Sequence, residues 1–181
     1  MKVLDLFCGM GGWAQAFVEN GHDVTGIDIM DYSSIYPGKF IKADLLTFTP
    51  EGYYDLIIAS PPCTDFSKAS MPRTWIAPSK YPPNIKEGVR LFMRAKEIID
   101  TLRPEYWVIE NVRGAQKFVG KADFHIGSRY FWSSVDFKIF WVQGSRDVHG
   151  KWKIPPGKDR PAMRSIIPYS ISRALEEAMK A

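Results

Sequence analysis

Short apolar runs separated by longer stretches with helical spacing are the feature of this sequence that most restricts its fold. Five such runs are expected to be strands, and they occupy residues 3–7, 24–27, 40–43, 54–59 and 106–109. Apolar strands that alternate with helices are typical of a parallel sheet that is covered on both faces. We therefore predict a single α/β domain with a mostly parallel sheet and helices on both faces.

Three helices are expected from apolar residues that recur at helical spacing. They span residues 13–20, 86–101 and 169–180. Residues 64–84 are rich in Ser, Pro and Lys and are expected to form a long loop. Residues 123–135 suggest a hairpin around Gly127 and Ser128, and residues 141–164 suggest further loops.

The ends of the predicted strands carry most of the residues with useful chemistry. A glycine-rich turn, Asp28, Asp44, Cys63 and Glu110 each follow or end one of the apolar runs. In open α/β sheets, ligands bind beyond the carboxyl ends of the strands. The sequence therefore predicts one site at one edge of the sheet.

The glycine-rich turn, Asp5-Leu6-Phe7-Cys8-Gly9-Met10-Gly11-Gly12, follows the first strand and opens a helix. Glycine lets the backbone approach a ligand closely, and a helix N-terminus favours negative charge. Asp28, one strand later, can bind a ribose hydroxyl. Taken alone, the turn could be purely structural and Asp28 a strand-end cap. Together they favour a cofactor that contains adenosine, and the spacing leaves open a dinucleotide or S-adenosylmethionine.

A Pro-Pro-Cys sequence follows the fourth strand. Pro61 and Pro62 fix the backbone and remove two N–H donors, so Cys63 is held rigidly over the predicted site. A cysteine thiolate is a nucleophile. The alternative is a buried structural cysteine, which is our interpretation of Cys8. Glu110 could hydrogen-bond or protonate a ring nitrogen if burial raises its pKa, or it could be a cap or a salt-bridge partner.

Composition excludes several other classes of protein. Hydrophobic residues make up 45% and charged residues 24% of the 181 residues, which is globular composition. No run approaches the roughly 18 apolar residues of a membrane span. Two cysteines cannot build a disulfide scaffold or a four-ligand zinc site, so we expect a reduced, intracellular compartment, no membrane and no metal. A formal net charge of +4 permits a polyanionic partner.

Three of these motifs resemble those of the cytosine-C5 DNA methyltransferases. Residues 5–12 resemble the motif with which that family binds S-adenosylmethionine. Residues 60–67, Ser-Pro-Pro-Cys-Thr-Asp-Phe-Ser, resemble its Pro-Pro-Cys nucleophile motif, and residues 110–112 resemble its Glu-Asn-Val motif. The resemblance covers residues 2–115 in order, and it implies a Rossmann-like, S-adenosylmethionine-dependent methyltransferase fold.

The resemblance also implies roles for individual residues. Cys63 would attack carbon 6 of cytosine, Glu110 would stabilise the protonated ring nitrogen 3, and Arg129 would hold the carbonyl oxygen. S-adenosylmethionine would be bound by residues of four strand ends, namely Phe7, Gly9, Gly11, Gly12, Asp28, Asp44 and Pro61.

The second half of the chain departs from the family. Where the family has Gln-x-Arg-x-Arg, residues 125–129 read His-Ile-Gly-Ser-Arg, so only the last arginine keeps its place. Residues 164–168, Arg-Ser-Ile-Ile-Pro, keep the proline of the family's Gly-Asn-x-Val-Pro. We expect a catalytic core at 2–115, a reduced recognition region at 137–163 and a C-terminal motif and helix at 164–181. This arrangement resembles the short forms found in phage and mobile-element genomes.

The expected substrate is cytosine in DNA, flipped out of a duplex or already single-stranded, with little sequence specificity. Alternatives are a tRNA cytosine and a catalytically weak binding subunit, and a protein partner could supply target recognition. Basic residues of the two loop regions are candidates for phosphate contacts, with Trp152 placed for stacking. They are Lys68, Arg73, Lys80, Arg146, Lys151, Lys153, Lys158 and Arg160.

Overall fold

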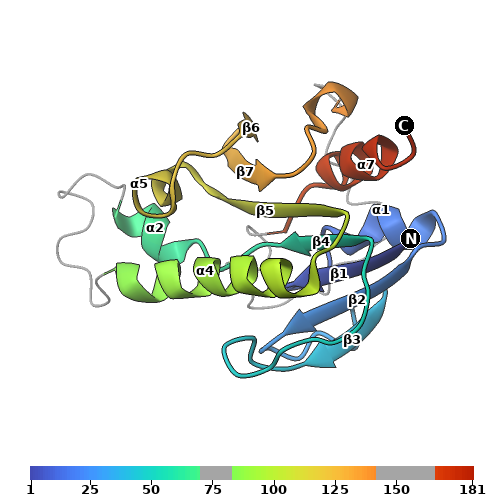
Figure 1. Cartoon of the computed structure of the whole chain (residues 1–181), viewed down its shortest axis with the longest axis horizontal. Helices are drawn as coiled ribbons and strands as arrows, with labels where there is room; N and C mark the ends of the chain where they lie inside the picture. Colours follow the sequence, from blue (N-terminus) through green and yellow to red (C-terminus); the bar gives the residue numbers. More distant parts are fainter. Residues whose placement is uncertain (70–82, 142–165) are drawn as a thin grey trace.

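A seven-stranded sheet forms the centre of the molecule. The computed structural model describes residues 1–69, 83–141 and 166–181 (Figure 1). The strand order is β3-β2-β1-β4-β5-β7-β6, with β1 to β5 parallel and β7 antiparallel to both β5 and β6. The strands are β1 (Lys2–Leu6), β2 (Asp23–Asp28), β3 (Lys39–Lys42), β4 (Leu56–Ala59), β5 (Tyr106–Val112), β6 (Phe124–Ile126) and β7 (Arg129–Ser133).

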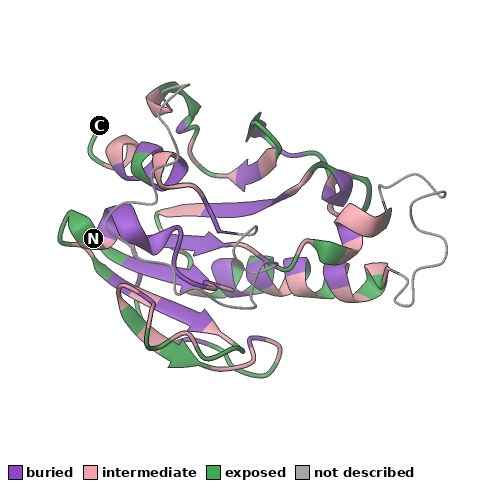
Figure 2. Cartoon of the chain, turned by 180° about the vertical axis from the view of Figure 1, so that it is seen from behind, coloured by how far each residue is buried: buried purple, intermediate pink, exposed green. Residues whose placement is uncertain are grey.

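Helices cover both faces of this sheet, which confirms the predicted α/β architecture. On one face, α1 (Ala14–Glu19) and α7 (Tyr169–Ala178) pack over an apolar cluster that includes Phe17 and Leu175. On the other, α2 (Thr64–Ala69) and α4 (Ile85–Leu102) pack over a second cluster, and α4 crosses the front of the sheet in Figure 1. Figure 2 shows the buried central strands between these layers and the exposed β3 at one edge.

Helix α4 shows how the sequence determines these layers. Phe92, Ala95 and Ile99 recur at spacings of three and four, so they form one face of the helix and are buried in the second cluster. The helix begins at Asn84, whose side chain accepts a hydrogen bond from the Glu87 N–H. It ends at Arg103, which takes the left-handed conformation that closes many helices.

Residues 64–84 do not form one continuous loop, so that prediction is wrong for its first part. Residues 64–69 form helix α2 directly after the Pro-Pro-Cys sequence. The reason is tertiary packing: the Phe66 ring is fully buried and lies against Gly88, where an added Cβ would come within 3.1 Å of it. At the other end of the segment, the backbone N–H of Asn84 binds the Asp65 carboxylate at 2.9 Å.

The hairpin predicted at residues 123–135 is confirmed as β6 and β7, and η1 (Arg113–Ala115) and α5 (Gln116–Val119) lie between β5 and β6. A short helix, η2 (Lys138–Phe140), follows β7. The predicted C-terminal helix is confirmed as α7, and Ser172 fixes it to α1. The Ser172 hydroxyl donates to the carbonyl of Trp13 and accepts from the N–H of Ala16. The predicted loops at 141–164 lie outside the described residues apart from Trp141.

Candidate active site

A cavity of about 700 Å³ opens at the carboxyl edge of the parallel strands, where the sequence predicts a site. That volume falls within the usual range of ligand pockets. Its wall contains every strand-end group singled out above, together with the start of β7 and the segment before α7. The site residues predicted from sequence that line it are Phe7, Gly9, Gly12, Asp28, Asp44, Pro61, Cys63, Glu110 and Arg129.

The glycine-rich turn and Asp28 are joined directly. The Gly9 N–H donates to Asp28 Oδ2 at 2.9 Å, and the Met30 N–H donates to Oδ1 at the same distance. The Asp28 carboxylate is therefore fixed at the cavity wall, and its remaining lone pairs can accept hydroxyl groups. Phe7 has a φ of +55°, which is uncommon for a residue with a side chain and is often seen at functional sites.

The three glycines of the turn have different roles. At Gly9, with φ +50°, an added Cβ would meet nothing within 4 Å, so the backbone is open to a ligand. At Gly12, an added Cβ would lie 2.7 Å from the backbone of Ile167. Gly11 does not line the cavity, because it packs against Tyr36 and Pro37 on the other side of the turn. The described structure thus brings two of the three glycines to the site.

Polar and apolar groups alternate along the same end of the cavity. Asp44 is fixed by the Leu46 N–H, which donates to its Oδ1 at 2.9 Å. Phe7, Ile29 and Leu45 supply apolar surface to the same cavity. A ligand with a flat apolar ring, hydrogen-bond donors on the ring edge and a hydroxylated sugar suits this end.

Two side chains and one backbone N–H hold the Pro-Pro-Cys segment in place. Asn111 Nδ2, fully buried on β5, donates to the Pro61 carbonyl at 2.9 Å. The Trp13 indole N–H donates to the Ser60 hydroxyl at 2.9 Å, and the Ser67 N–H donates to the Cys63 carbonyl, also at 2.9 Å. These bonds place the half-buried Cys63 thiol on the cavity wall.

The electrostatic surroundings of Cys63 disfavour a thiolate in the unliganded protein. Burial raises the pKa of the thiol, and the nearby Glu110 carboxylate raises it further. A hydrogen bond from Ser67 and the positive charge of Arg129 act in the opposite direction. Because the thiolate and the Glu110 carboxylate repel each other, states in which the pair retains one proton are favoured.

Glu110 and Arg129 form an ion pair beside Cys63. Glu110 is only 6% exposed, and burial raises the pKa of its carboxyl group although Arg129 and Ser60 both lower it. Arg129 Nη1 donates to Glu110 Oε1 at 3.2 Å, and Arg129 Nη2 donates to the Ile166 carbonyl at 2.7 Å. A partly buried acid with a raised pKa can donate a hydrogen bond or a proton to a bound base.

Sequence reasoning missed several residues that support the site. Trp13, Ser60 and Ile166 contribute hydrogen bonds between segments that are far apart in the sequence. No local sequence pattern predicts these bonds. Asn111 follows Glu110 in the Glu-Asn-Val motif, and this motif could have identified it as a residue of the site. Cys8 is buried, and burial and the Asp5 charge raise the pKa of its thiol, in agreement with a structural role.

Most of the residues predicted to contact nucleic acid lie outside the described ranges, and Lys68 is the exception. Lys68 lies on α2, directly beyond the cavity wall at Cys63 and Thr64. The remaining candidates lie outside the described residues: Arg73, Lys80, Arg146, Lys151, Trp152, Lys153, Lys158 and Arg160. Within the described ranges, no group of three or more His, Cys, Asp or Glu side chains could hold a metal ion, and no helix is long and apolar enough to cross a membrane.

Comparison with known proteins shows which chains this one is similar to. A sequence model of C-5 cytosine-specific DNA methylases matches residues 1–141. The chain is 29% identical over 120 residues to the type II methyltransferase M.AplI of Arthrospira platensis, covering 63% of this chain and 32% of that one. It is also 29% identical over 116 residues to a probable DNA (cytosine-5)-methyltransferase of frog virus 3, covering 61% and 53%. With the tRNA (cytosine(38)-C(5))-methyltransferase of Mus musculus it shares 27% over 129 residues, covering 63% and 29%.

The chain therefore spans between about a third and a half of the length of these relatives. Among solved structures, it is similar to a crystal structure described as a prophage-encoded DNA modification methyltransferase from E. coli. The TM-score is 0.50 at 22% identity, covering 66% of this chain and 35% of that one. This likeness concerns the fold, and it agrees with the Rossmann-like methyltransferase fold expected from the motifs.

Proposed function

The chain belongs to the family of C-5 cytosine-specific DNA methylases, and from that membership we propose that it transfers a methyl group from S-adenosylmethionine to carbon 5 of cytosine in DNA. The observation that carries the proposal is the meeting of Cys63, Glu110 and Arg129 in one cavity with the glycine-rich turn and Asp28. The first three can act on a pyrimidine, and the others can hold a nucleoside cofactor.

The cofactor end of the cavity fits S-adenosylmethionine. Asp28 would accept hydrogen bonds from the ribose hydroxyls, Phe7 and Ile29 would contact the adenine, and Asp44 would accept a hydrogen bond from the adenine amino group. Gly9 has an open backbone position that lets the amino-acid part approach closely. When bound, the cofactor supplies an electrophilic methyl group.

Cys63 starts the reaction by adding to the ring. Its sulfur forms a bond to cytosine carbon 6, and the electrons of the 5,6 double bond become available at carbon 5. Carbon 5 then forms a bond to the methyl carbon, whose bond to the sulfonium sulfur breaks, so that S-adenosylhomocysteine is the leaving group. Loss of the carbon-5 proton to a base restores the double bond and breaks the bond between sulfur and carbon 6. Covalent catalysis of this kind replaces one difficult step with easier ones.

Glu110 prevents negative charge from building up on the ring. As a neutral acid it donates a hydrogen bond or its proton to ring nitrogen 3, and it takes the proton back when the thiolate leaves. The pKa of Glu110 is raised by burial, which favours this protonated form. The active state of the pair has the proton on Glu110 and the charge on Cys63, because a neutral Glu110 no longer repels a thiolate.

Arg129 orients the base and the acid together. One side of its guanidinium binds Glu110, and the other binds the Ile166 carbonyl, so the group is fixed in the cavity wall. Its five donors are not all used by these two bonds. A remaining N–H can donate to the cytosine carbonyl oxygen, which fixes carbon 6 against the sulfur.

The cavity accepts a base only when the base has left the helical stack. Unstacking costs a few kcal/mol in a duplex and less in a single strand. We propose, as in the sequence analysis, that residues 137–163 form a reduced recognition region and that target specificity is relaxed or supplied by a partner. The second candidate substrate is a cytosine in tRNA, because the chain is also similar to the mouse tRNA (cytosine(38)-C(5))-methyltransferase.

Covalent trapping tests this function. DNA with 5-fluorocytosine in place of cytosine, together with S-adenosylmethionine, should give an adduct of protein, DNA and methyl group. The fluorine replaces the proton whose loss breaks the bond to sulfur, so the adduct accumulates. Peptide mapping should locate it at Cys63 and not at Cys8, the other cysteine. Cys63→Ser should give none.

The same experiment separates the alternatives. A tRNA containing 5-fluorocytosine is the parallel substrate, and an adduct with tRNA alone assigns the RNA reaction. No adduct with either nucleic acid, from protein that binds S-adenosylmethionine, would refute the enzymatic proposal and leave a binding subunit.

A further inference from the structure

Four exposed basic side chains follow one another at intervals of four residues beyond strand β5. They are Arg113 on η1, Lys117 on α5, Lys121 after α5 and His125 on β6, here called the α5 strip. None of the loop residues predicted to bind phosphate belongs to this strip. It lies in the described part of the chain.

The backbone of the strip is fixed to the rest of the fold. Phe118 stacks on Phe66 of α2, with ring centroids 5.9 Å apart and planes at 24°. The Ala122 N–H donates to Gln116 Oε1 at 3.1 Å, which folds the chain after α5 back along it. The Trp132 indole N–H of β7 donates to the Gly120 carbonyl at 3.2 Å. The strip therefore has a set position over β7 and beside α2.

The end of the strip on β6 is also ordered. The His125 ring stacks on the Tyr130 ring at 5.1 Å and 20°, and His125 Nδ1 lies 3.2 Å from the Gly127 carbonyl. His125 and Tyr130 belong to the β6–β7 hairpin and lie opposite each other in the sheet register.

The positive charge of the strip is not balanced by ion pairs. In the described ranges, no carboxylate lies within ion-pair distance of Arg113, Lys117 or Lys121. Several cations on other helices are paired, namely Arg90 with Glu87 and Arg94 with Glu97 on α4, and Arg173 with Glu177 on α7.

One carboxylate does occur in this stretch of sequence. Asp123 precedes β6, and its Oδ2 accepts a hydrogen bond from the Ser133 N–H at 2.9 Å. Cations four residues apart on a helix repel each other by a few tenths of a kcal/mol. Arg113 and Lys117 are four residues apart along η1 and α5, and in the described ranges neither is paired with an acid.

Both ends of the strip adjoin the cavity. Val112 lines the cavity wall, and Arg113 is the next residue. At the other end, Ser128 and Arg129 line the wall a few residues beyond His125. A nucleic-acid strand that places a base in the cavity would leave it near the residues at which the strip begins and ends.

We propose that the α5 strip binds the phosphodiester backbone of the DNA next to the cytosine in the cavity. The proposal rests on the proposed function for its substrate. It assigns to Arg113, Lys117 and Lys121 contacts with one phosphate each, and it explains why exposed, unpaired cations border the cavity. Phosphate contacts of this kind fix the position of the nucleic acid without reading its sequence.

The salt dependence of binding tests the proposal. A labelled cytosine-containing duplex is titrated with the wild-type chain and with the triple variant R113Q/K117Q/K121Q, by fluorescence anisotropy at several salt concentrations. Each lost phosphate contact reduces the slope of log K against log salt by about 0.9 for a duplex and about 0.7 for a single strand. We expect the slope for the duplex to fall by about 2.7 in the triple variant.

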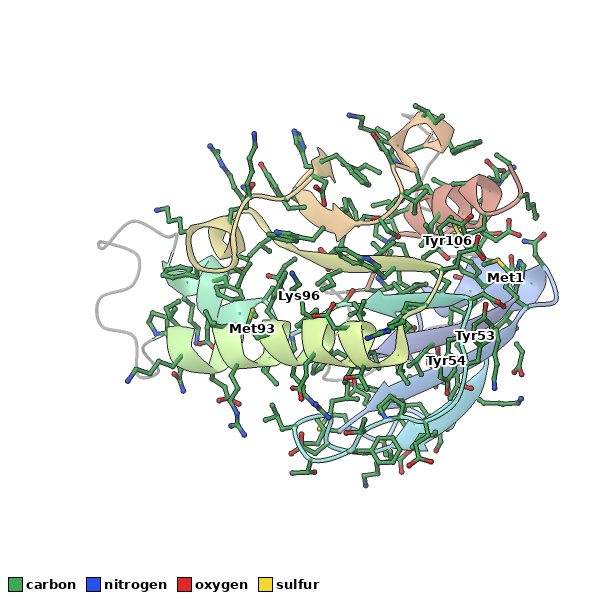
Figure 3. All side chains as sticks on the ribbon, viewed as in Figure 1. Met1, Tyr53, Tyr54, Met93, Lys96 and Tyr106 are labelled. Atoms are coloured by element: carbon green, nitrogen blue, oxygen red, sulfur yellow. The ribbon has the colours of Figure 1, made fainter. Side chains whose placement is uncertain are left out.

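Lys96 provides the matched control. It is exposed on α4, where Figure 3 labels it, it is not part of the strip, and no ion pair involves it among the described residues. Lys96→Gln removes the same charge from the chain, so its slope should equal that of the wild type. Lys117→Gln, the matched single change, should lower the slope by about 0.9. Equal melting temperatures will show that the variants fold.

The possible results separate phosphate binding by the strip from the proposed methyl transfer. An unchanged slope in the triple variant would overturn the proposal that the strip binds phosphates. If that variant still methylates DNA, the proposed function would be unaffected. Reduced slopes in a protein that methylates nothing would support the strip and refute the proposed function. A reduced slope with tRNA but not with DNA would overturn DNA as the occupant.

Discussion

Asp5 should make the stability of this protein depend on pH in an unusual direction. It lies on β1 beneath the glycine-rich turn and is fully buried. Its Oδ2 accepts a hydrogen bond from the Tyr36 hydroxyl at 3.1 Å, and its Oδ1 has no partner among the described residues. Burial raises the pKa of Asp5 from 3.8 to about 8; the charge of Asp28 adds to this, and the Tyr36 hydrogen bond opposes it.

The sign follows from the protons bound in each state. Between pH 4 and 8 the folded chain keeps Asp5 protonated, whereas the unfolded chain has it ionised. The folded state therefore binds one more proton, and its stability falls as the pH rises. One proton corresponds to about 1.4 kcal/mol per pH unit, so Asp5 should cost about 3 kcal/mol between pH 5 and 7. That is a large share of a typical stability of about 5–15 kcal/mol.

Urea unfolding at pH 5, 6 and 7 measures this effect, with Asp5→Asn as the comparison. Asparagine has the same shape and can still accept the Tyr36 hydrogen bond, but it does not titrate. The wild-type free energy of unfolding should fall relative to that of Asp5→Asn by about 3 kcal/mol over this range. Other titrating groups are common to both proteins and cancel in the difference. Parallel curves would show that Asp5 is ionised in the folded protein and that this reasoning is wrong.

Three further substitutions test residues in the site and in the packing around it. Asn111→Ala leaves the buried Pro61 carbonyl without its donor, so it should cost about 1–3 kcal/mol in urea unfolding and slow formation of the covalent adduct. Gly26→Ala would place a Cβ 2.3 Å from the Tyr36 ring, so the free energy of unfolding should fall by at least about 1–3 kcal/mol. Glu110→Gln keeps the shape but not the acid, so single-turnover methyl transfer should slow by about 10²–10⁴-fold while cofactor affinity, measured by calorimetry, stays the same.

The position of the site could be predicted from the sequence because it follows from topology. Parallel strands bring their carboxyl ends to one edge, so residues far apart in the chain, such as Asp28 and Glu110, could be placed together from the order of the apolar runs alone. The place of Cys63 on the cavity wall was predictable for a local reason, because two prolines restrict the backbone before it.

Other features could not be predicted because they depend on contacts between distant segments. Residues 64–69 have a loop-like composition, yet they form a helix because Phe66 packs against Gly88. Gly11 looks like its neighbours in the turn, but Tyr36 passes beside it to reach Asp5. No local pattern in the sequence distinguishes a glycine that faces a ligand from one that faces a tyrosine.

The two departures from the family motifs are close in sequence to Arg129 and to its partner Ile166. Gly127, where the family has its first arginine, lies two residues before Arg129, and the altered residues 164–165 lie just before Ile166. Arg129 is nevertheless held on both sides, by the Glu110 carboxylate and by the Ile166 carbonyl. Because any residue supplies a backbone carbonyl, this contact does not depend on the side chains that the chain has changed. Glu110 and Arg129 can therefore keep their geometry while the surrounding motifs diverge.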